Sequence, residues 1–181
     1  MKILILKKNR VLMIALFILF LAIGIIYAEP KIESVQSQKL KPIYSVKTTT
    51  NQIAITFDIS WGEENLVPVL DALKKENIKA TFFLSSPWAE KHSELVKMIV
   101  TEGHEIGSHG KRHVDLNTLS QATLLSELTE AQKSLETLSN QKIALLRPPN
   151  GAYDNQLITT AKNIDQRVIQ WSIDSLDWQK P

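Results

Sequence analysis

The stretch IAITFD at residues 53–58 decides the fold, because a short apolar run there ends at a carboxylate, Asp58. Four later runs of the same kind are separated from one another by helical patterns, at residues 80–84, 104–108, 143–146 and 168–173. Strands that alternate with helices predict a parallel sheet. Polar residues directly follow several of these strands, and in α/β folds ligands gather beyond the carboxyl ends of the strands. The pattern therefore indicates an α/β fold with an enzyme-type site.

Apolar residues at helical spacing mark the segments between the strands. The clearest segment is 121–138, where leucines recur at helical spacing after Ser120, a candidate N-cap. Three further helices are predicted at residues 66–73, 86–103 and 157–161. The chain then ends at Pro181, whereas an eight-fold α/β barrel typically needs about 250 residues. The sequence therefore predicts either an open sheet or an incomplete barrel.

Composition narrows the classes of function. The chain has 181 residues, 44% of them hydrophobic, which suits one domain with a buried core. It has no cysteine, so a metal site would depend on His, Asp or Glu. The formal net charge is +2, but four basic residues and no acid lie before residue 28, which leaves −2 on the rest. This slightly acidic body lacks the basic field that supports nucleic-acid binding, and we exclude such a partner.

The amino terminus predicts a membrane segment. Residues 11–28, VLMIALFILFLAIGIIYA, carry no charge and would extend about 27 Å as a helix. Basic residues precede this segment, which predicts a cytoplasmic amino terminus and an extracytoplasmic body. Ala28 also suits the end of a cleaved signal peptide, although Ile26 is larger than the usual small residue, so both a retained anchor and a secreted product stay open. The predicted parts are 1–28 as anchor or signal, 29–51 as linker with a short edge strand, and 52–181 as the domain.

His109 and His113 are the candidate metal ligands. Their spacing of four residues would place both imidazoles on one face of a helical turn, where they could bind a single cation. The predicted strand that ends just before them favours this interpretation over two exposed loop residues. His92 and His104 lack such a context, and we interpret them as structural or surface residues.

Asp58 and Arg147 each come at the end of a predicted strand. A carboxylate at the end of a buried strand must meet a cation, a donor or solvent, although it could also cap the next loop. Two prolines follow Arg147 and have no N–H, so Asn150 supplies the first backbone donor of that loop, which could serve an oxyanion. Asp174 and Asp177 lie beside Trp178, whose ring could either pack against a sugar or cover the end of the barrel.

Four motifs in order resemble the polysaccharide deacetylase (NodB-homology) family. They are Thr56-Phe57-Asp58, the segment from Ser108 to His113, Arg147-Pro148-Pro149-Asn150-Gly151, and the segment from Asp174 to Trp178. The segment at residues 56–62 is similar to the sporulation-associated branch of the family. The resemblance implies a deformed (β/α) barrel, incomplete at the carboxyl terminus, that removes acetyl groups from amino-sugar polymers such as peptidoglycan or chitin with a divalent metal, usually zinc.

The resemblance also implies a role for each matching residue. Asp58 would be the general base, and Arg147 would orient it. His109 and His113 would bind the metal, whose charge lowers the pKa of water and stabilises the carbonyl oxygen. Asn150 would donate its N–H to the oxyanion. Asp174 would support the general acid, a histidine of a fifth motif that the chain does not reach.

Two departures from the family pattern open a second hypothesis. The family has a second, metal-binding Asp where this chain has Ile59, whose aliphatic side chain cannot bind a cation. Asn150 replaces the usual aromatic residue of its motif. The first hypothesis is a membrane-tethered N-deacetylase domain directed at the cell wall. It predicts that the release of acetate depends on Asp58. The alternative is a catalytically inactive relative that binds glycan or assists wall or spore assembly.

Overall fold

The computed structural model describes residues 8–27 and 38–179, and contacts divide the chain into two units, Met1–Gln38 and Lys39–Pro181. In the first unit, helix α1 spans Lys8–Tyr27 and contains most of the segment for which we predicted an anchor. Ala28 and most of the predicted linker lie outside the described residues. Across the described ranges, no helix combines the length and apolarity needed to cross a membrane.

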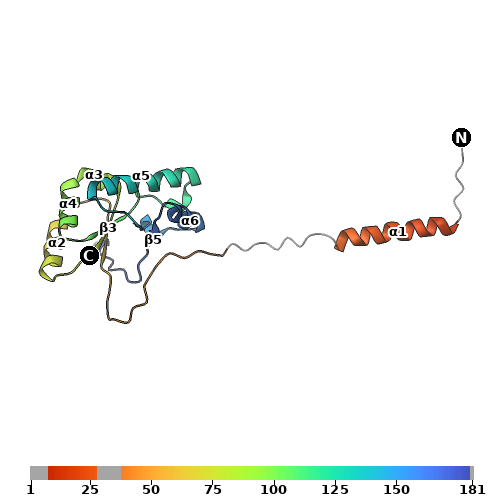
Figure 1. The fold of residues 1–181 in the computed structure, drawn as a ribbon, viewed down its shortest axis with the longest axis horizontal. Helices are drawn as coiled ribbons and strands as arrows, with labels where there is room; N and C mark the ends of the chain where they lie inside the picture. Colours follow the sequence, from red (N-terminus) through yellow and green to blue (C-terminus); the bar gives the residue numbers. More distant parts are fainter. Residues whose placement is uncertain (1–7, 28–37, 180–181) are drawn as a thin grey trace. The chain divides into compact units, whose positions relative to one another are not determined.

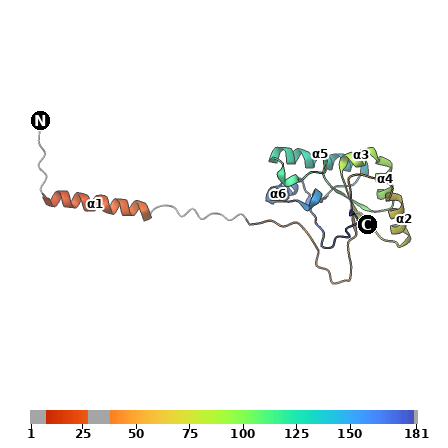
Figure 2. The same cartoon turned by 180° about the vertical axis from the view of Figure 1, so that it is seen from behind.

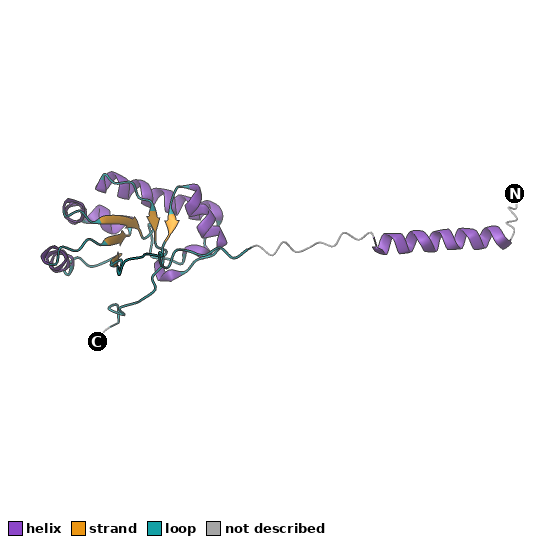
Figure 3. Ribbon diagram, turned by 60° about the horizontal axis from the view of Figure 1, so that its bottom comes forward, coloured by secondary structure: helices purple, strands orange, loops and turns teal. Residues whose placement is uncertain are grey.

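The second unit is built on five parallel strands in the order β1-β2-β3-β4-β5, which confirms the predicted α/β fold with a parallel sheet (Figure 1). The strands are β1 (Thr56–Ile59), β2 (Thr81–Leu84), β3 (Glu105–Ser108), β4 (Leu145–Leu146) and β5 (Arg167–Val168). Figures 2 and 3 show helices arranged around these strands. The carboxyl ends of the strands therefore open together at one edge of the sheet.

The helices between the strands are α2 (Leu66–Lys75), α3 (Ser86–Lys91), α4 (Ser93–Thr101), α5 (Gln121–Ser139) and α6 (Asn155–Asn163), with short 3₁₀ turns at Leu116–Thr118 and Pro149–Gly151. Ser120 caps α5, since its side chain accepts the Thr123 N–H, as predicted. The helix predicted at 86–103 is two helices, because the backbone leaves helical geometry at His92 (φ −120°, ψ 44°). α3 packs against α5 (Figure 1).

Side chains of the strands alternate between two faces of the sheet. Phe57 and Ile59 of β1 pack against a buried apolar cluster that includes Phe82, Leu84 and Ile106. Asp58 lies between them in sequence and therefore belongs to the opposite face, beside Phe83 of β2. The alternation of side chains along β1 thus places Asp58 and Ile59 on opposite faces of the sheet.

Two strand predictions are corrected at their boundaries. The first strand begins at Thr56 rather than at residue 53, so Asp58 lies inside β1 and not after it. The last strand is Arg167–Val168 rather than 168–173, because the pairing fades after Val168: Ile169 still donates its N–H to the Leu146 carbonyl oxygen and forms an isolated bridge with Ile43. The edge strand predicted near Ile43 is limited to this bridge. Without further partners the following segment is irregular, and Ile173 is 86% exposed.

Candidate active site

Arg147 and Asp58 form the central ion pair of the site. Arg147 follows β4, and its Nη1 donates to Asp58 Oδ1 at 2.7 Å and to Thr56 Oγ1 at 2.8 Å. Its Nη2 donates to the carbonyl oxygen of Gln170 at 3.3 Å. The Arg147 side chain is 4% exposed and that of Asp58 is 35% exposed. The buried guanidinium therefore fixes the position of a carboxylate that solvent and ligands can reach.

The ring of Phe83 on β2 packs against the buried guanidinium. The Arg147 Cζ lies 4.1 Å from the centroid of the Phe83 ring, in a cation–π arrangement. Phe83 can lie flat because its neighbour on β3 is Gly107, where an added Cβ would come within 2.5 Å of the ring. Within the described residues, Arg147 Nε is buried without a hydrogen-bond partner. Asp58, Phe83 and Gly107 are thus paired with one another across β1, β2 and β3, and this row of the sheet supports the Arg147 side chain.

His109 is held by two hydrogen bonds at the end of β3. Its backbone N–H donates to the Leu84 carbonyl oxygen at 2.8 Å, and its Nδ1 lies 2.8 Å from the Arg147 carbonyl oxygen. Because a carbonyl only accepts, Nδ1 must carry the proton, which leaves the lone pair of Nε2 free for a ligand. Burial lowers the pKa of His109, and the nearby Asp58 charge opposes this only in part. His109 is therefore a neutral imidazole at pH 7.

His113 lies beside His109, with ring centroids 5.5 Å apart, and its ring also meets that of Trp61 edge-on at 4.9 Å. The helical turn predicted for this pair is wrong: the segment is an irregular loop in which Gly110 has a φ of +80°. The loop nevertheless brings the rings together. Two imidazole nitrogens suit a divalent cation such as zinc. Across the described ranges, however, no group of three or more His, Asp or Glu side chains could hold a metal ion.

The other predicted site residues occupy two loops. Asn150 adopts a left-handed backbone (φ 57°) and donates its side-chain amide to Asp115 Oδ1 at 2.8 Å. Asp174 accepts the Leu176 N–H at 2.9 Å in an exposed segment that continues through Asp177 to Trp178, which is 71% exposed. Among the described residues, none of these side chains forms a hydrogen bond, ion pair or cation–π contact with Asp58 or Arg147, and their roles stay predictions.

Sequence reasoning missed four residues that complete the geometry. Thr56 and Gln170 accept hydrogen bonds from Arg147, Phe83 underlies it, and Trp61 meets His113. Thr56 could have been found, because it lies two residues before Asp58 and so shares its face of the strand. The contact of Gln170 uses its backbone carbonyl, which leaves no signal in the side-chain pattern.

The family model described as polysaccharide deacetylase matches residues 45–169. The chain belongs to the polysaccharide deacetylase family. Among curated relatives, protein YlxY of Bacillus subtilis is 31% identical over 87% of this chain and 50% of its own length. A peptidoglycan-N-acetylglucosamine deacetylase of Bacillus cereus is 34% identical over 71% of this chain and 46% of its own length.

Solved structures of the polysaccharide deacetylase family share this fold. A crystal structure described as a carbohydrate esterase family 4 pseudoenzyme from Bacillus anthracis superposes with a TM-score of 0.75 at 32% identity, over 78% of this chain and 51% of that one. The chain spans about half the length of the curated relatives that it matches. The family thus includes both named peptidoglycan deacetylases and a pseudoenzyme.

Proposed function

We propose that this domain removes N-acetyl groups from an amino-sugar polymer of the cell wall, with peptidoglycan as the substrate class. The observation that carries the proposal is the pair of Asp58 and Arg147 beside His109 at the open edge of the sheet. A buried cation that fixes a half-exposed carboxylate is expensive for packing alone, since apolar side chains would fill the same volume at lower cost. It suits a carboxylate that must accept a proton from a reacting molecule.

His109 and His113 are the residues that would hold a divalent metal, and such a metal would supply an activated water and charge stabilisation. His109 fits this role because its Nδ1–H donates to the backbone carbonyl oxygen of Arg147, so the lone pair of Nε2 can bind the metal. Ile59 provides no third ligand, and its side chain packs toward the apolar core. The expected metal affinity is therefore lower than that of a three-ligand site.

The second candidate is an inactive relative that binds the same polymer, and Ile59 favours it. Catalytic zinc sites have three protein ligands, and a pseudoenzyme is among the similar solved structures. In this case the exposed rings near the site, such as Trp61, would provide the surface on which sugars pack.

One experiment separates the two candidates. The full chain, its Asp58→Asn variant and its Ile59→Asp variant are incubated with N-acetylated peptidoglycan and zinc, and both released acetate and bound polymer are measured. A deacetylase releases acetate in the wild type and not in Asp58→Asn. A binding protein retains the polymer in all three forms with no release by the wild type. Acetate release that is equal in wild type and Asp58→Asn contradicts the hydrolytic proposal.

The proposed location is the outer side of a membrane. The uncharged segment 11–28 and the basic residues before it support this proposal, either as a retained anchor or as a cleaved signal. A role in sporulation belongs to the same proposal and is supported by the resemblance of residues 56–62. Protease added to intact cells would degrade an external domain. Protection of residues 39–179 until the cells are lysed would contradict the external location.

A further inference from the structure

A buried carboxylate on α5 is not part of the motifs described above. Glu127 is only 4% exposed, although it carries a charge. Its neighbours on the same helix are core residues, since Leu124, Leu128 and Ala131 are fully buried. A buried carboxylate is costly unless hydrogen bonds and a counter-charge compensate it. The partners of Glu127 therefore indicate what it stabilises.

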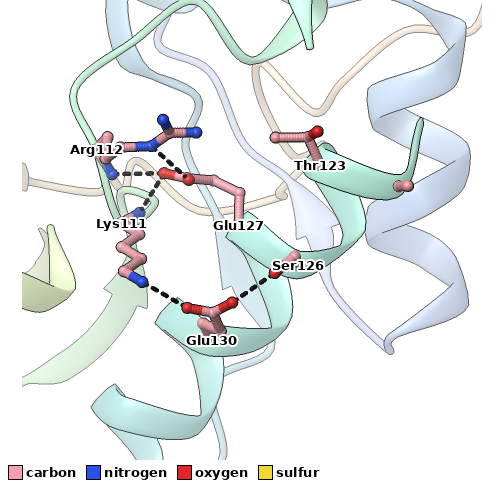
Figure 4. Close-up of a pocket in the computed structure, with 7 residues that line it drawn as sticks. Lys111, Arg112, Thr123, Ser126, Glu127 and Glu130 are labelled. Atoms are coloured by element: carbon pink, nitrogen blue, oxygen red, sulfur yellow. Dashed lines mark hydrogen bonds and ion pairs between the residues drawn. The ribbon is translucent and has the colours of Figure 1, made fainter. Parts of the chain in front are cut away.

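In the part of the chain that the structure describes, the hydrogen-bond and ion-pair partners of Glu127 lie in the loop that carries the two histidines. Its Oε1 accepts the backbone N–H groups of Lys111 and Arg112, and its Oε2 accepts Arg112 Nε at 2.9 Å (Figure 4). These two amides lie between His109 and His113, and within the described residues neither donates to a backbone carbonyl oxygen. One side chain of α5 thus accepts both backbone N–H groups in the middle of the loop.

His113 depends on this loop more than His109 does. The His109 ring is fixed by its hydrogen bond to the Arg147 carbonyl oxygen. Within the described residues, the His113 ring makes contacts with the rings of Trp61 and His109 and no hydrogen bond. Its position must therefore come mainly from the backbone that leads to it, which Glu127 holds one residue earlier.

We propose that Glu127 is a positioning residue that fixes the backbone of residues 111–112 and thereby sets the His113 ring beside that of His109. The proposal deepens the proposed function, because it concerns the two residues assigned to the metal. Glu127 itself touches neither metal nor substrate. Supports of this kind that orient a ligand typically change metal affinity by about 10- to 100-fold when they are removed.

The chain offers a matched control on the same helix. Glu130 lies one turn away and accepts Lys111 Nζ and Ser126 Oγ, both side-chain donors, so it pairs with the loop without holding its backbone (Figure 4). Glu127→Gln keeps the shape of the side chain but removes the charge, and Glu127→Ala removes the acceptor altogether. Glu130→Gln removes a charge at a similar place and leaves the backbone contacts intact.

The experiment measures the loop directly by NMR in the full chain without metal, and then measures zinc affinity by titration. Glu127→Ala is expected to speed hydrogen exchange of the Lys111 and Arg112 amides by about tenfold or more, and to shift the His113 ring resonances. Zinc affinity is expected to fall by about 10-fold or more. Glu127→Gln should show the same changes in smaller degree, and Glu130→Gln should show neither. If Glu127→Ala does not fold, Glu127→Gln decides.

Three results would overturn the proposal. They are unchanged amide exchange and His113 resonances in both Glu127 variants, equal effects of Glu127→Gln and Glu130→Gln, and faster exchange spread evenly over the whole domain, which would indicate a general role in stability. If the wild type binds no zinc but the His113 resonances still shift in the Glu127 variants, the positioning role stands and the metal role of the histidines fails. The two proposals are therefore tested separately.

Discussion

Removing Asp58 should destabilise the domain more than removing Arg147, although the two form one ion pair. Asp58→Ala leaves a guanidinium that is 4% exposed without its counter-charge, whereas Arg147→Met leaves a carboxylate that is 35% exposed and can recover water. Breaking a buried pair from one side costs about 3–5 kcal/mol. We expect the lower end, about 3 kcal/mol, for Asp58→Ala, because Arg147 keeps Thr56, Gln170 and the Phe83 ring.

The expected cost of Arg147→Met is about 1–2 kcal/mol, because Met fills most of the volume but leaves the acceptors Thr56 Oγ1 and Gln170 O without their donor. Urea unfolding followed by circular dichroism measures both values, with Asp58→Asn as the variant that keeps an acceptor for Nη1. The reasoning is refuted if Arg147→Met costs as much as Asp58→Ala, or if Asp58→Ala costs less than about 1 kcal/mol.

Three further changes test other parts of the structure. Gly107→Ala should destabilise the domain by about 1–3 kcal/mol in the same unfolding assay, because its Cβ would come within 2.5 Å of the Phe83 ring. An unchanged midpoint would contradict this close packing of Gly107 against Phe83. Burial lowers the pKa of His104, whose Nδ1 accepts the Ala80 N–H, so protonation opposes folding. The contribution of His104 to the free energy of unfolding should therefore be fully present above about pH 6.5 and decrease as the pH drops below it. In His104→Gln, the free energy of unfolding should depend less steeply on pH in this range. His113→Ala should abolish zinc binding in a titration with the full chain, and retained affinity would exclude His113 as a ligand.

The sequence predicts which strands exist better than where they begin and end. The run that starts at residue 53 is apolar, yet Ile53 is 86% exposed, because β1 pairs with β2 only from Thr56 onward. At the other end, Ile173 is 86% exposed for the same reason, since β5 ends where its neighbours end. Hydrophobic runs show that a segment can form a strand. The partner that is present for each residue determines the boundary.

Contacts between distant residues were predictable only where the fold imposes a rule. Asp58 and Arg147 are 89 residues apart, on β1 and directly after β4, which are not adjacent in the sheet. Because all the strands are parallel, residues near their carboxyl ends gather on one side, where the long Arg147 side chain can reach Asp58. The support of the histidine loop by Glu127 follows from no such rule, because it depends on an irregular loop. One signal was present: Glu127 occupies a place next to Leu128 on the apolar stripe of its helix, where a charge needs a partner.

The position of Ile59 connects the stability of the domain to its chemistry. Its side chain packs with Leu84 in the apolar core, so the Ile59→Asp variant must either bury a carboxylate there or turn it toward the histidines. Without metal, such a variant should therefore unfold more easily than the wild type. Zinc that binds only the folded form would offset part of this loss, by an amount that grows with the logarithm of its concentration above the dissociation constant. Because both variants keep the two histidines, a midpoint that rises more with zinc in Ile59→Asp than in Ile59→Ala would mean that the new carboxylate reaches the cation. An equal response in both would mean that residue 59 faces the core alone and that a third ligand cannot be restored at this position.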